Sequence, residues 1–500
     1  MNFKTGTLNG EKSKGKPMFK NKEHFHVLIA LLLSMSVLFL LPATNGLTRQ
    51  GIVVLSIVVP TIYMWLFVNT HWVSLLFLGL LGITEIMTPN QIWAGSLGHF
   101  TITLVLTFSI LSECLNETGA IKKISTWFIT RPFVQSKPYA FMAMFFASNI
   151  IIGMVMQNLA LAVMYVALTA KICEDLEIKK GESMYTCLML GTFWTNSVIS
   201  IASPIAKTLP NILIGLVYTT FGVQITYAQW FMIGVPFSIV MFGVVMLCIR
   251  LSNPDTTKIK NFDIELFKKD DVPLSKRGKI ALWGMMALIA IVIFPELFLA
   301  MDIFVPVSSY FARIGSTVPA IIIIIALSLI RVEENNNSIP VLDFAQTAKS
   351  VPINLLIFVA AVVIMGTPIA SEASGIVPWI HNMLYPITSG LPVLGVVVML
   401  IIISTVLTNF LSNTVVMTLA FHMGVTILAY QAINPIVVAV LIAFAACMAC
   451  LTPSSALTAP LFYGPEHIKV REAMKDNVIF VILSIIVVIA LTPLTIAVLG

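Results

Sequence analysis

The chain is a series of apolar segments separated by short polar connections, and the segments fall into two length classes. A helix that crosses a hydrocarbon core about 30 Å thick needs about 20 apolar residues. Most segments are close to that length, but four are much longer. Segments of single-crossing length are 27–42, 51–69, 71–88, 101–118, 226–251, 280–300, 314–330, 352–371 and 478–499, and the long ones are 139–173, 184–222, 393–430 and 435–463.

The long segment 393–430 predicts two half-helices. As one helix it would extend ~57 Å at ~1.5 Å per residue, and two full crossings with a loop do not fit into it. Its polar centre, Ser412-Asn413-Thr414, marks the tip of a re-entrant hairpin, because unpaired backbone at membrane depth is tolerated only inside protein or beside water. Segment 139–173, with Gln157-Asn158 at its centre, predicts a matching hairpin.

The other two long segments predict helices that are broken in the middle. Pro204 and Pro210 interrupt the first, and Thr452-Pro453-Ser454-Ser455 interrupts the second. A proline removes a backbone donor and frees carbonyls of the preceding turn, so both breaks combine free carbonyls with hydroxyls. Such oxygens are ligands for hard monovalent cations. The alternative is that the hydroxyls bond back to carbonyls of their own helix and only bend it.

Composition and charge place the chain in a membrane and orient it. Its residues are 58% hydrophobic and 10% charged, against roughly 25% charged in soluble domains. The formal charge of +6 is uneven, because residues 1–22 carry many lysines whereas 373–392 carry no lysine or arginine. Basic connections stay in the cytoplasm. We therefore expect eleven crossings of the plasma membrane, with a cytoplasmic N-terminus and an extracellular C-terminus.

Two halves of the chain repeat the same signals at the same spacing. Glu117-Thr118-Gly119 precedes the Gln157-Asn158 tip by about forty residues, and Glu372-Ala373-Ser374-Gly375 precedes the Ser412-Asn413 tip by a similar distance. The first hairpin is entered from a basic side and the second from a neutral side. An inverted-topology repeat requires this difference. The predicted fold is an all-α integral membrane protein of about 11 transmembrane helices and two re-entrant hairpins.

The repeat also predicts a division into scaffold and transport elements. The parts are a cytosolic basic tail (1–26), first-half scaffold helices (27–136), first-half transport elements (137–251), a cytosolic linker (252–279), second-half scaffold helices (280–389) and second-half transport elements (390–500).

Three short motifs resemble those of the divalent anion/sodium symporters, a family that carries di- and tricarboxylates and sulfate. Leu407-Thr408-Asn409-Phe410-Leu411-Ser412-Asn413-Thr414 resembles the family's second hairpin motif. Leu451-Thr452-Pro453 resembles its motif at the second helix break, and Thr208-Leu209-Pro210-Asn211 resembles the motif at the first break. The resemblance implies a homodimer in which hairpins and broken helices move as an elevator against a fixed scaffold.

The resemblance also implies roles for individual residues. The implied sodium ligands are Thr408, Leu411, Asn413 and Leu451, and the first half adds Asn158 and Ser203 as candidate cation ligands. The implied substrate contacts are Asn413, Thr414 and Pro453, with Gln157, Asn158 and Ser412 as further candidates at the two hairpin tips.

The first half departs from the family pattern at two places. Its tip reads Gln157-Asn158-Leu159 instead of Ser-Asn-Thr, and Lys207 stands where the family usually has glycine. A lysine near mid-membrane costs on the order of 3 kcal/mol or more, which marks it as a functional candidate. We hypothesise that its ammonium replaces the first sodium ion or pairs with a substrate carboxylate. The alternative is that the side chain extends to the inner membrane surface.

The predicted function is secondary active transport of a small divalent anion, a di- or tricarboxylate, and not an enzymatic reaction. The expected coupling ion is Na⁺, with no other cofactor, no nucleic-acid partner and lipid around the protein. One alternative is a sodium-independent exchanger or H⁺-coupled carrier that uses Lys207, with His422 as a proton carrier. An ion channel is a remoter alternative, because the same broken helices would line a continuous pore.

Overall fold

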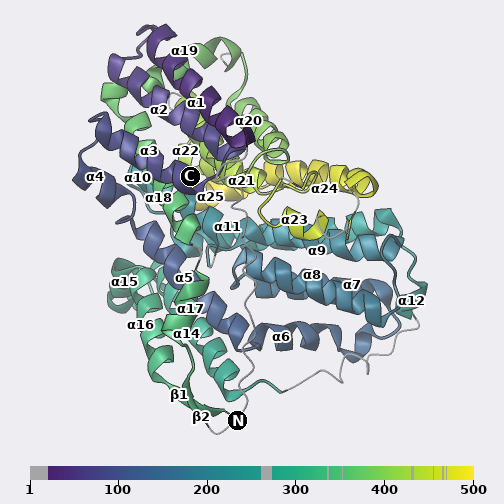
Figure 1. The fold of residues 1–500 in the computed structure, drawn as a ribbon. Coiled ribbons are helices and arrows are strands. Elements are labelled where there is room, and N and C mark those ends of the chain that lie inside the picture. The colour runs from purple at the N-terminus through teal and green to yellow at the C-terminus, as the bar shows by residue number, and fades with distance from the viewer. Residues whose placement is uncertain are drawn as a thin grey trace, which may run out of the picture.

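The computed structural model describes residues 21–205, 207–260, 273–334, 337–351, 353–388, 390–428, 433–453, 455–463, 467–468 and 470–500. Most of the predicted basic tail and residues 261–272 of the predicted linker lie outside this part of the chain. The described residues are almost entirely α-helical (Figure 1), as the apolar segments predict. All six cysteines are buried and free.

The helices of the first half cover the predicted segments and add short helices at 89–95, 120–129 and 257–260, in the predicted connections. They are α1 (Asn21–Leu40), α2 (Arg49–Phe67), α3 (His71–Ile83), α4 (Pro89–Gly95), α5 (Phe100–Glu117), α6 (Ala120–Ile129), α7 (Pro138–Gly153), α8 (Asn158–Asp175), α9 (Ser183–Ala202), α10 (Thr208–Phe221), α11 (Tyr227–Ser252) and α12 (Thr257–Lys260).

The second half repeats this order with additions. Its elements are α14 (Lys276–Ala300), α15 (Val305–Ile314), α16 (Thr317–Leu329), β1 (Arg331–Glu334), β2 (Asn337–Pro340), α17 (Phe344–Thr347), α18 (Ile353–Ala370), α19 (Ile376–Thr388), α20 (Val393–Thr408), α21 (Asn413–Leu428), α22 (Pro435–Ala446), α23 (Ala459–Tyr463), α24 (Val470–Ala490) and α25 (Thr492–Leu499).

The described helices account for the predicted crossings. Seven helical stretches are long and apolar enough to cross a membrane, and an eighth arises when α15 and α16 are counted together. The other predicted crossings coincide with α3, with α9 and α10, and with α22 and α23. The last two are interrupted because the chain breaks where the polar residues lie, whereas α3 is one short helix of 13 residues.

Each predicted hairpin is a pair of helices that pack against each other, and their re-entry into the membrane stays a prediction. The first pair, α7 and α8, is interrupted at 154–157, and the second pair, α20 and α21, at 409–412. Each interruption falls at the predicted polar tip, so α8 begins at Asn158 and α21 begins at Asn413. Figure 1 shows α7 and α8 lying side by side next to α9.

The two broken helices form the centre of the molecule. Chain segment 203–207 separates α9 from α10, and 447–458 separates α22 from α23. Nearly every residue of α9, and every residue of α22 after Pro435, is buried. A helix that is covered on all sides occupies a core position. Both helices of the first hairpin pack on α9, and both helices of the second pack on α22.

Equivalent hydrogen bonds join hairpin and break in the two halves. Ser203 Oγ donates to the carbonyl of Met154 over 2.6 Å, and Thr452 Oγ1 donates to the carbonyl of Asn409 over 2.6 Å. Each hydroxyl precedes a proline in the break, and each carbonyl belongs to the C-cap residue of the hairpin's first helix. This pairing is what the predicted inverted repeat requires.

Several elements of the second half lie outside the predicted segments, among them α17 and α19 in the predicted connections. Helix α15 precedes the predicted segment 314–330 and meets α16 at 82°. Gly315 lies between them at a φ of 67°, a conformation that glycine adopts without steric cost. The strands β1 and β2 pair antiparallel with Val332 opposite Ile339, which adds a small hairpin to an otherwise helical fold.

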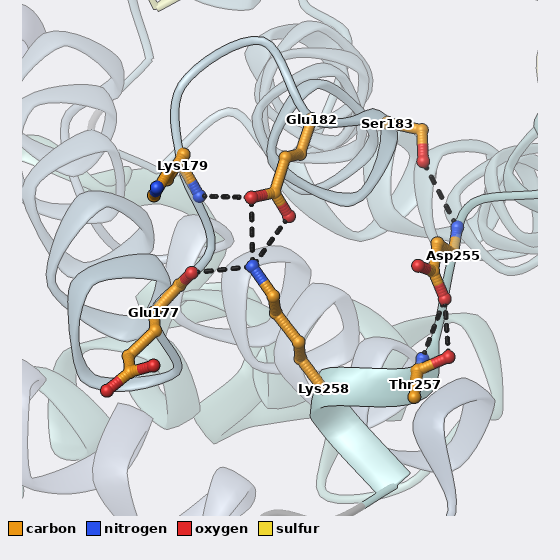
Figure 2. A network of polar contacts seen from close by, with 7 residues as sticks. All are labelled: Glu177, Lys179, Glu182, Ser183, Asp255, Thr257 and Lys258. Carbon is orange, nitrogen blue, oxygen red and sulfur yellow. Dashed lines mark hydrogen bonds and ion pairs between the residues drawn. The ribbon is translucent and has the colours of Figure 1, made fainter.

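A polar network ties the α8–α9 connection to the segment that follows α11 (Figure 2). Lys258 Nζ donates to both carboxylate oxygens of Glu182, over 2.8 and 2.9 Å, and to the carbonyl of Glu177 over 2.6 Å. The backbone N–H of Asp255 donates to Ser183 Oγ over 3.1 Å. The bond from Lys258 holds the pKa of the Glu182 carboxyl below its usual value. The network thus fixes the end of the first hairpin to the start of the linker.

Candidate functional site

A cavity of about 180 Å³ lies where the two hairpin tips meet the two helix breaks. The side chains around it come from both halves of the chain, and Leu355 comes from α18. Its lining residues are Gln157, Asn158, Leu159, Ser197, Ser200, Lys207, Thr208, Leu209, Leu355, Ser412, Asn413, Thr414, Ala456, Leu457 and Thr458.

The electrostatics of the cavity favour an anion. Helices α8, α10 and α21 begin at Asn158, Thr208 and Asn413, and all three residues line the cavity. Helix N-termini present free N–H groups and a partial positive charge, which bind anions. None of the described lining residues is acidic, and one, Lys207, is basic. The lining therefore offers donors and positive charge to a carboxylate.

Lys207 lies inside the protein at the edge of the first hairpin tip. Its side chain is 2% exposed, and its Nζ donates to Asn158 Oδ1 over 3.4 Å. The side chain therefore lines the cavity rather than reaching the protein surface. At the equivalent position of the second break, directly before Thr458, stands the apolar Leu457. The positive charge is thus confined to one half of the site.

Two of the candidate sodium ligands meet in the second half. Thr408 Oγ1 donates to Asn413 Oδ1 over 2.9 Å and to the carbonyl of Ala446 over 2.5 Å. Thr408 is fully buried below the tip, whereas Asn413 is partly exposed and lines the cavity. Side-chain and backbone oxygens therefore converge beside the cavity, where α20, α21 and α22 meet. Such oxygens are ligands for a hard monovalent cation.

Six of the candidate site residues line the cavity, and the other five are not among its lining residues. The lining set is Gln157, Asn158, Lys207, Ser412, Asn413 and Thr414, and the set outside the lining is Ser203, Thr408, Leu411, Leu451 and Pro453. Ser203 is fully buried in the first break, Leu411 and Leu451 are half-buried, and Pro453 is exposed. Ser454 of the predicted second break lies outside the described residues.

Asn409 holds the second break although the sequence assigns it no role. Its Oδ1 accepts hydrogen bonds from the backbone N–H groups of Cys450 and Leu451, each over 2.9 Å. Its Nδ2 donates to the carbonyl of Thr405 over 2.7 Å. The equivalent position in the first half is Met154, which has no amide group. The second break is therefore tied to its hairpin more firmly than the first.

Several lining residues were not among the predicted site residues. Ser197 and Ser200 lie one turn apart on α9, and Leu355 comes from α18. Thr208 and Thr458 each precede a proline by two residues, as Thr208-Leu209-Pro210 and Thr458-Ala459-Pro460. This repeated Thr-x-Pro pattern is the sequence signal that could have identified Thr458.

His422, the candidate proton carrier, lies away from the cavity lining. It is half-buried on α21, and its Nε2 is buried with no hydrogen-bond partner among the described residues. A Cβ built on Gly366 of α18 would lie 3.0 Å from His422 Cε1, so the imidazole packs directly against that helix. His422 therefore lies between the second hairpin and α18.

Comparison with known proteins agrees with this architecture. The chain is similar to the sodium-dependent dicarboxylate transporter SdcS of Staphylococcus saprophyticus, with 23% identity over 93% of this chain and 89% of the relative. It is equally similar to the SdcS protein of Staphylococcus aureus strain USA300, with 23% identity over 98% of this chain and 95% of the relative.

A solved structure shares the fold of this chain. The crystal structure of the Alcanivorax borkumensis YdaH transporter, described as having an unusual topology, superposes with a TM-score of 0.52. The match covers 83% of this chain and 88% of that chain at 8% sequence identity.

The family profile described as citrate transporter (CitMHS) matches residues 52–449, which span both hairpins and the first broken helix. This protein is a multi-pass membrane carrier that belongs to the citrate transporter family, in agreement with its resemblance to the divalent anion/sodium symporters.

Proposed function

We propose that the protein carries a small di- or tricarboxylate across the membrane, coupled to Na⁺, by elevator-type alternating access. The observation that carries this proposal is the cavity between the hairpin tips, where three helix N-termini and the Lys207 ammonium surround a space whose described lining has no acidic residue. A carboxylate bound there gains charge-assisted hydrogen bonds from N–H and O–H donors. The names of the Staphylococcus relatives support both the substrate class and the coupling ion.

A carrier must bind its substrate strongly enough to load and weakly enough to release. Neutral hydroxyls, amides and helix N-termini give moderate binding, which suits release. Thr408 and Asn413 are the proposed core of the sodium site in the second half, because their oxygens lie 2.9 Å apart beside the cavity. Sodium bound there places a positive charge next to the substrate position, so each ligand strengthens the binding of the other.

Uptake into proteoliposomes tests the proposed function. Labelled succinate, citrate and sulfate are presented with and without an inward sodium gradient. We expect saturable uptake of succinate or citrate that the gradient accelerates, and exchange against internal substrate. Uptake at the same rate with and without the sodium gradient would indicate the sodium-independent exchanger or H⁺-coupled carrier. Large unitary currents would indicate a channel.

We propose in addition that Lys207 occupies the place of a cation in the first half of the site. Asn158 and Asn413 begin equivalent helices, but Asn413 Oδ1 faces the hydroxyl of Thr408 whereas Asn158 Oδ1 faces the Lys207 ammonium. A fixed ammonium supplies the charge that a second sodium ion would bring. The carrier then couples to fewer sodium ions than a symmetric site would.

Lys207→Met tests this role. Removing the buried ammonium leaves the substrate carboxylate and Asn158 without their positive partner, so we expect the KM for succinate to rise about tenfold or more. The sodium dependence of uptake should steepen if a sodium ion enters the vacated place. Lys349→Met, at an exposed lysine outside the cavity, is the matched control. Unchanged KM and unchanged sodium dependence in Lys207→Met contradict the proposal.

The orientation and assembly are also proposals. We infer a cytoplasmic N-terminus and an extracellular C-terminus from the basic connections. We further propose a homodimer in which residues 137–251 and 390–500 move against the scaffold helices. The packing of both hairpins on the broken helices supports their motion as one body.

A further inference from the structure

The break that carries Lys207 is held by one buried amide, that of Asn211. This residue lies in the first turn of α10 and is fully buried. Its Nδ2 donates to the carbonyl of Lys207 over 2.6 Å and to the carbonyl of Pro204 over 2.8 Å. Both amide protons are therefore used to hold the backbone of the break.

The third bond of Asn211 anchors it to a neighbouring helix. Its Oδ1 accepts a hydrogen bond over 2.8 Å from the hydroxyl of Tyr227, which lies at the start of α11. Tyr227 is 4% exposed, so this hydroxyl has little access to water. The chain of bonds runs from Tyr227 through Asn211 to the backbone of Lys207. The three hydrogen bonds of this amide hold the backbone of the break in one conformation, because any other conformation would leave a buried donor or acceptor unpaired, which is costly.

Lysine depends on such support more than most side chains. Its ammonium ends a flexible stem with four rotatable bonds, so its placement begins with the backbone that carries it. The Lys207 backbone is extended, with φ −115° and ψ 135°, and directs the side chain toward Asn158 in the cavity. A shift of the break would move the ammonium away from that oxygen.

The second break uses the same device without a lysine. Asn477 of α24 is fully buried, and its Nδ2 donates to the carbonyl of Cys450 over 3.0 Å and to the hydroxyl of Tyr463 over 2.7 Å. Its Oδ1 accepts from Trp194 Nε1 over 2.8 Å. Each break is thus held by a buried asparagine that an aromatic side chain anchors. The second break provides a matched comparison in which no charge is positioned.

We propose that Asn211, anchored by Tyr227, is the positioning residue that aims the Lys207 ammonium into the substrate cavity. This inference rests on the role proposed above for Lys207. Asn211 itself does not line the cavity and acts only through the backbone of the break. It therefore belongs to the binding machinery although it touches no ligand.

A double-mutant cycle measured by succinate uptake into proteoliposomes tests the inference. The variants are Asn211→Leu, Tyr227→Phe and Lys207→Met, alone and combined. Each single change should raise the KM for succinate with a smaller effect on the maximal rate. In the Asn211→Leu or Tyr227→Phe background, adding Lys207→Met should change KM by less than about twofold, because the ammonium is already misplaced.

The second break supplies the control. Trp194→Phe removes the anchor of Asn477, and its fold-change in KM should multiply with that of Lys207→Met to within about twofold. If Asn211→Leu does not fold, as judged by gel filtration, the Tyr227→Phe cycle decides alone. The inference is overturned if, in the Asn211 and Tyr227 cycles, the fold-change in KM of the double variant equals the product of the two single fold-changes. A silent Lys207→Met overturns the role of Lys207 and this inference with it, whereas absence of wild-type uptake overturns the proposed function itself.

Discussion

At the scale of single residues, the site differs between its halves by a few substitutions. Gln157 and Leu159 replace the serine and threonine found at the second tip. Lys207 of the first break occupies the position equivalent to Leu457 of the second. The two halves share the order of hairpin and break, and these side chains decide which half holds charge and which offers neutral oxygens. The asymmetry fits the proposal that one cavity serves both an anion and a coupling cation.

Thr408→Val is predicted to weaken sodium binding. The change keeps the shape of the side chain but removes the hydroxyl that bonds Asn413 Oδ1 and the carbonyl of Ala446. Loss of a buried hydrogen-bond partner costs about 1–3 kcal/mol, which corresponds to a rise of roughly fivefold or more in the sodium concentration for half-maximal uptake. The measurement is succinate uptake titrated with sodium.

Thr405→Val is its matched control. Thr405 lies one turn earlier on α20, and its hydroxyl donates to the carbonyls of Ile401 and Ala445 without contacting Asn413. The variant should leave the sodium concentration for half-maximal uptake within about twofold of wild type. Equal effects of the two substitutions would mean that Thr408 acts only through helix packing.

The sequence predicted which residues lie at the site better than it predicted what each of them does there. Spacing and polarity placed Asn158, Asn413 and Lys207 at the tips and the break, and the structure brings all three to one cavity. The sequence assigned no structural role to Asn409 or Asn211, because their value lies in bonds to backbone groups that are distant until the chain folds. A local sequence pattern does not indicate which distant backbone groups a side chain will bond in the folded protein.

At the scale of elements, close backbone approach at the first break sets how α11 packs. A Cβ built on Gly234 of α11 would lie 2.0 Å from the carbonyl oxygen of Ala202, the last residue of α9. Gly243, further along α11, has nothing within 4 Å of its Cβ position. The first glycine therefore permits the contact between α11 and the break, whereas the second has no steric role.

This contrast gives a stability prediction within one helix. Gly234→Ala should lower the thermal unfolding temperature, because relieving the overlap with a backbone carbonyl costs about 1–3 kcal/mol or more. Gly243→Ala should be neutral or raise it, since alanine in a helix interior is favoured over glycine by about 1 kcal/mol. Unfolding of purified protein, followed by tryptophan fluorescence, compares the two. Equal unfolding temperatures would contradict the packing described for α11.

The network of Figure 2 makes the anchoring of the first hairpin depend on pH. The pKa of Glu182 is lowered from its ordinary value of 4.5 by the hydrogen bond from Lys258. A lowered acid pKa stabilises the fold above the ordinary value, and this contribution disappears as pH falls through the lowered value. Glu182→Gln should therefore lower the unfolding temperature at pH 7 and have no effect at a pH well below 4. A difference that persists unchanged at the acidic pH would contradict this origin.

The sequence predicts the boundary between two helices where an apolar segment is too long for one crossing and has polar residues at its centre. The stretch 393–430 is too long for one crossing, and its break falls at the predicted tip. Helix α15 escaped prediction because its residues mix polar and apolar side chains, as in Ser308-Ser309-Tyr310, and so do not read as a crossing. The β1–β2 hairpin is similarly short and polar.

At the scale of the whole molecule, two inverted halves enclose one cavity between them. Both hairpins pack on the central broken helices α9 and α22, and α18 contributes Leu355 to the cavity wall. Under the proposed elevator mechanism, the hairpins and broken helices would move against α18 and expose the site to each side in turn. The inverted repeat, which the sequence predicts from motif spacing and loop charge, is what brings the two tips together.

Alternating access requires the second hairpin tip to face water on each side of the membrane in turn. The measurement is labelling of Ser412→Cys, with the native cysteines replaced, by a membrane-impermeant thiol reagent applied to each side of oriented vesicles. We predict labelling from both sides, slowed by succinate with sodium. If the cysteine at position 412 reacts with the impermeant reagent from neither side and reacts only with a lipid-soluble reagent, the tip lies against acyl chains and alternating access is contradicted.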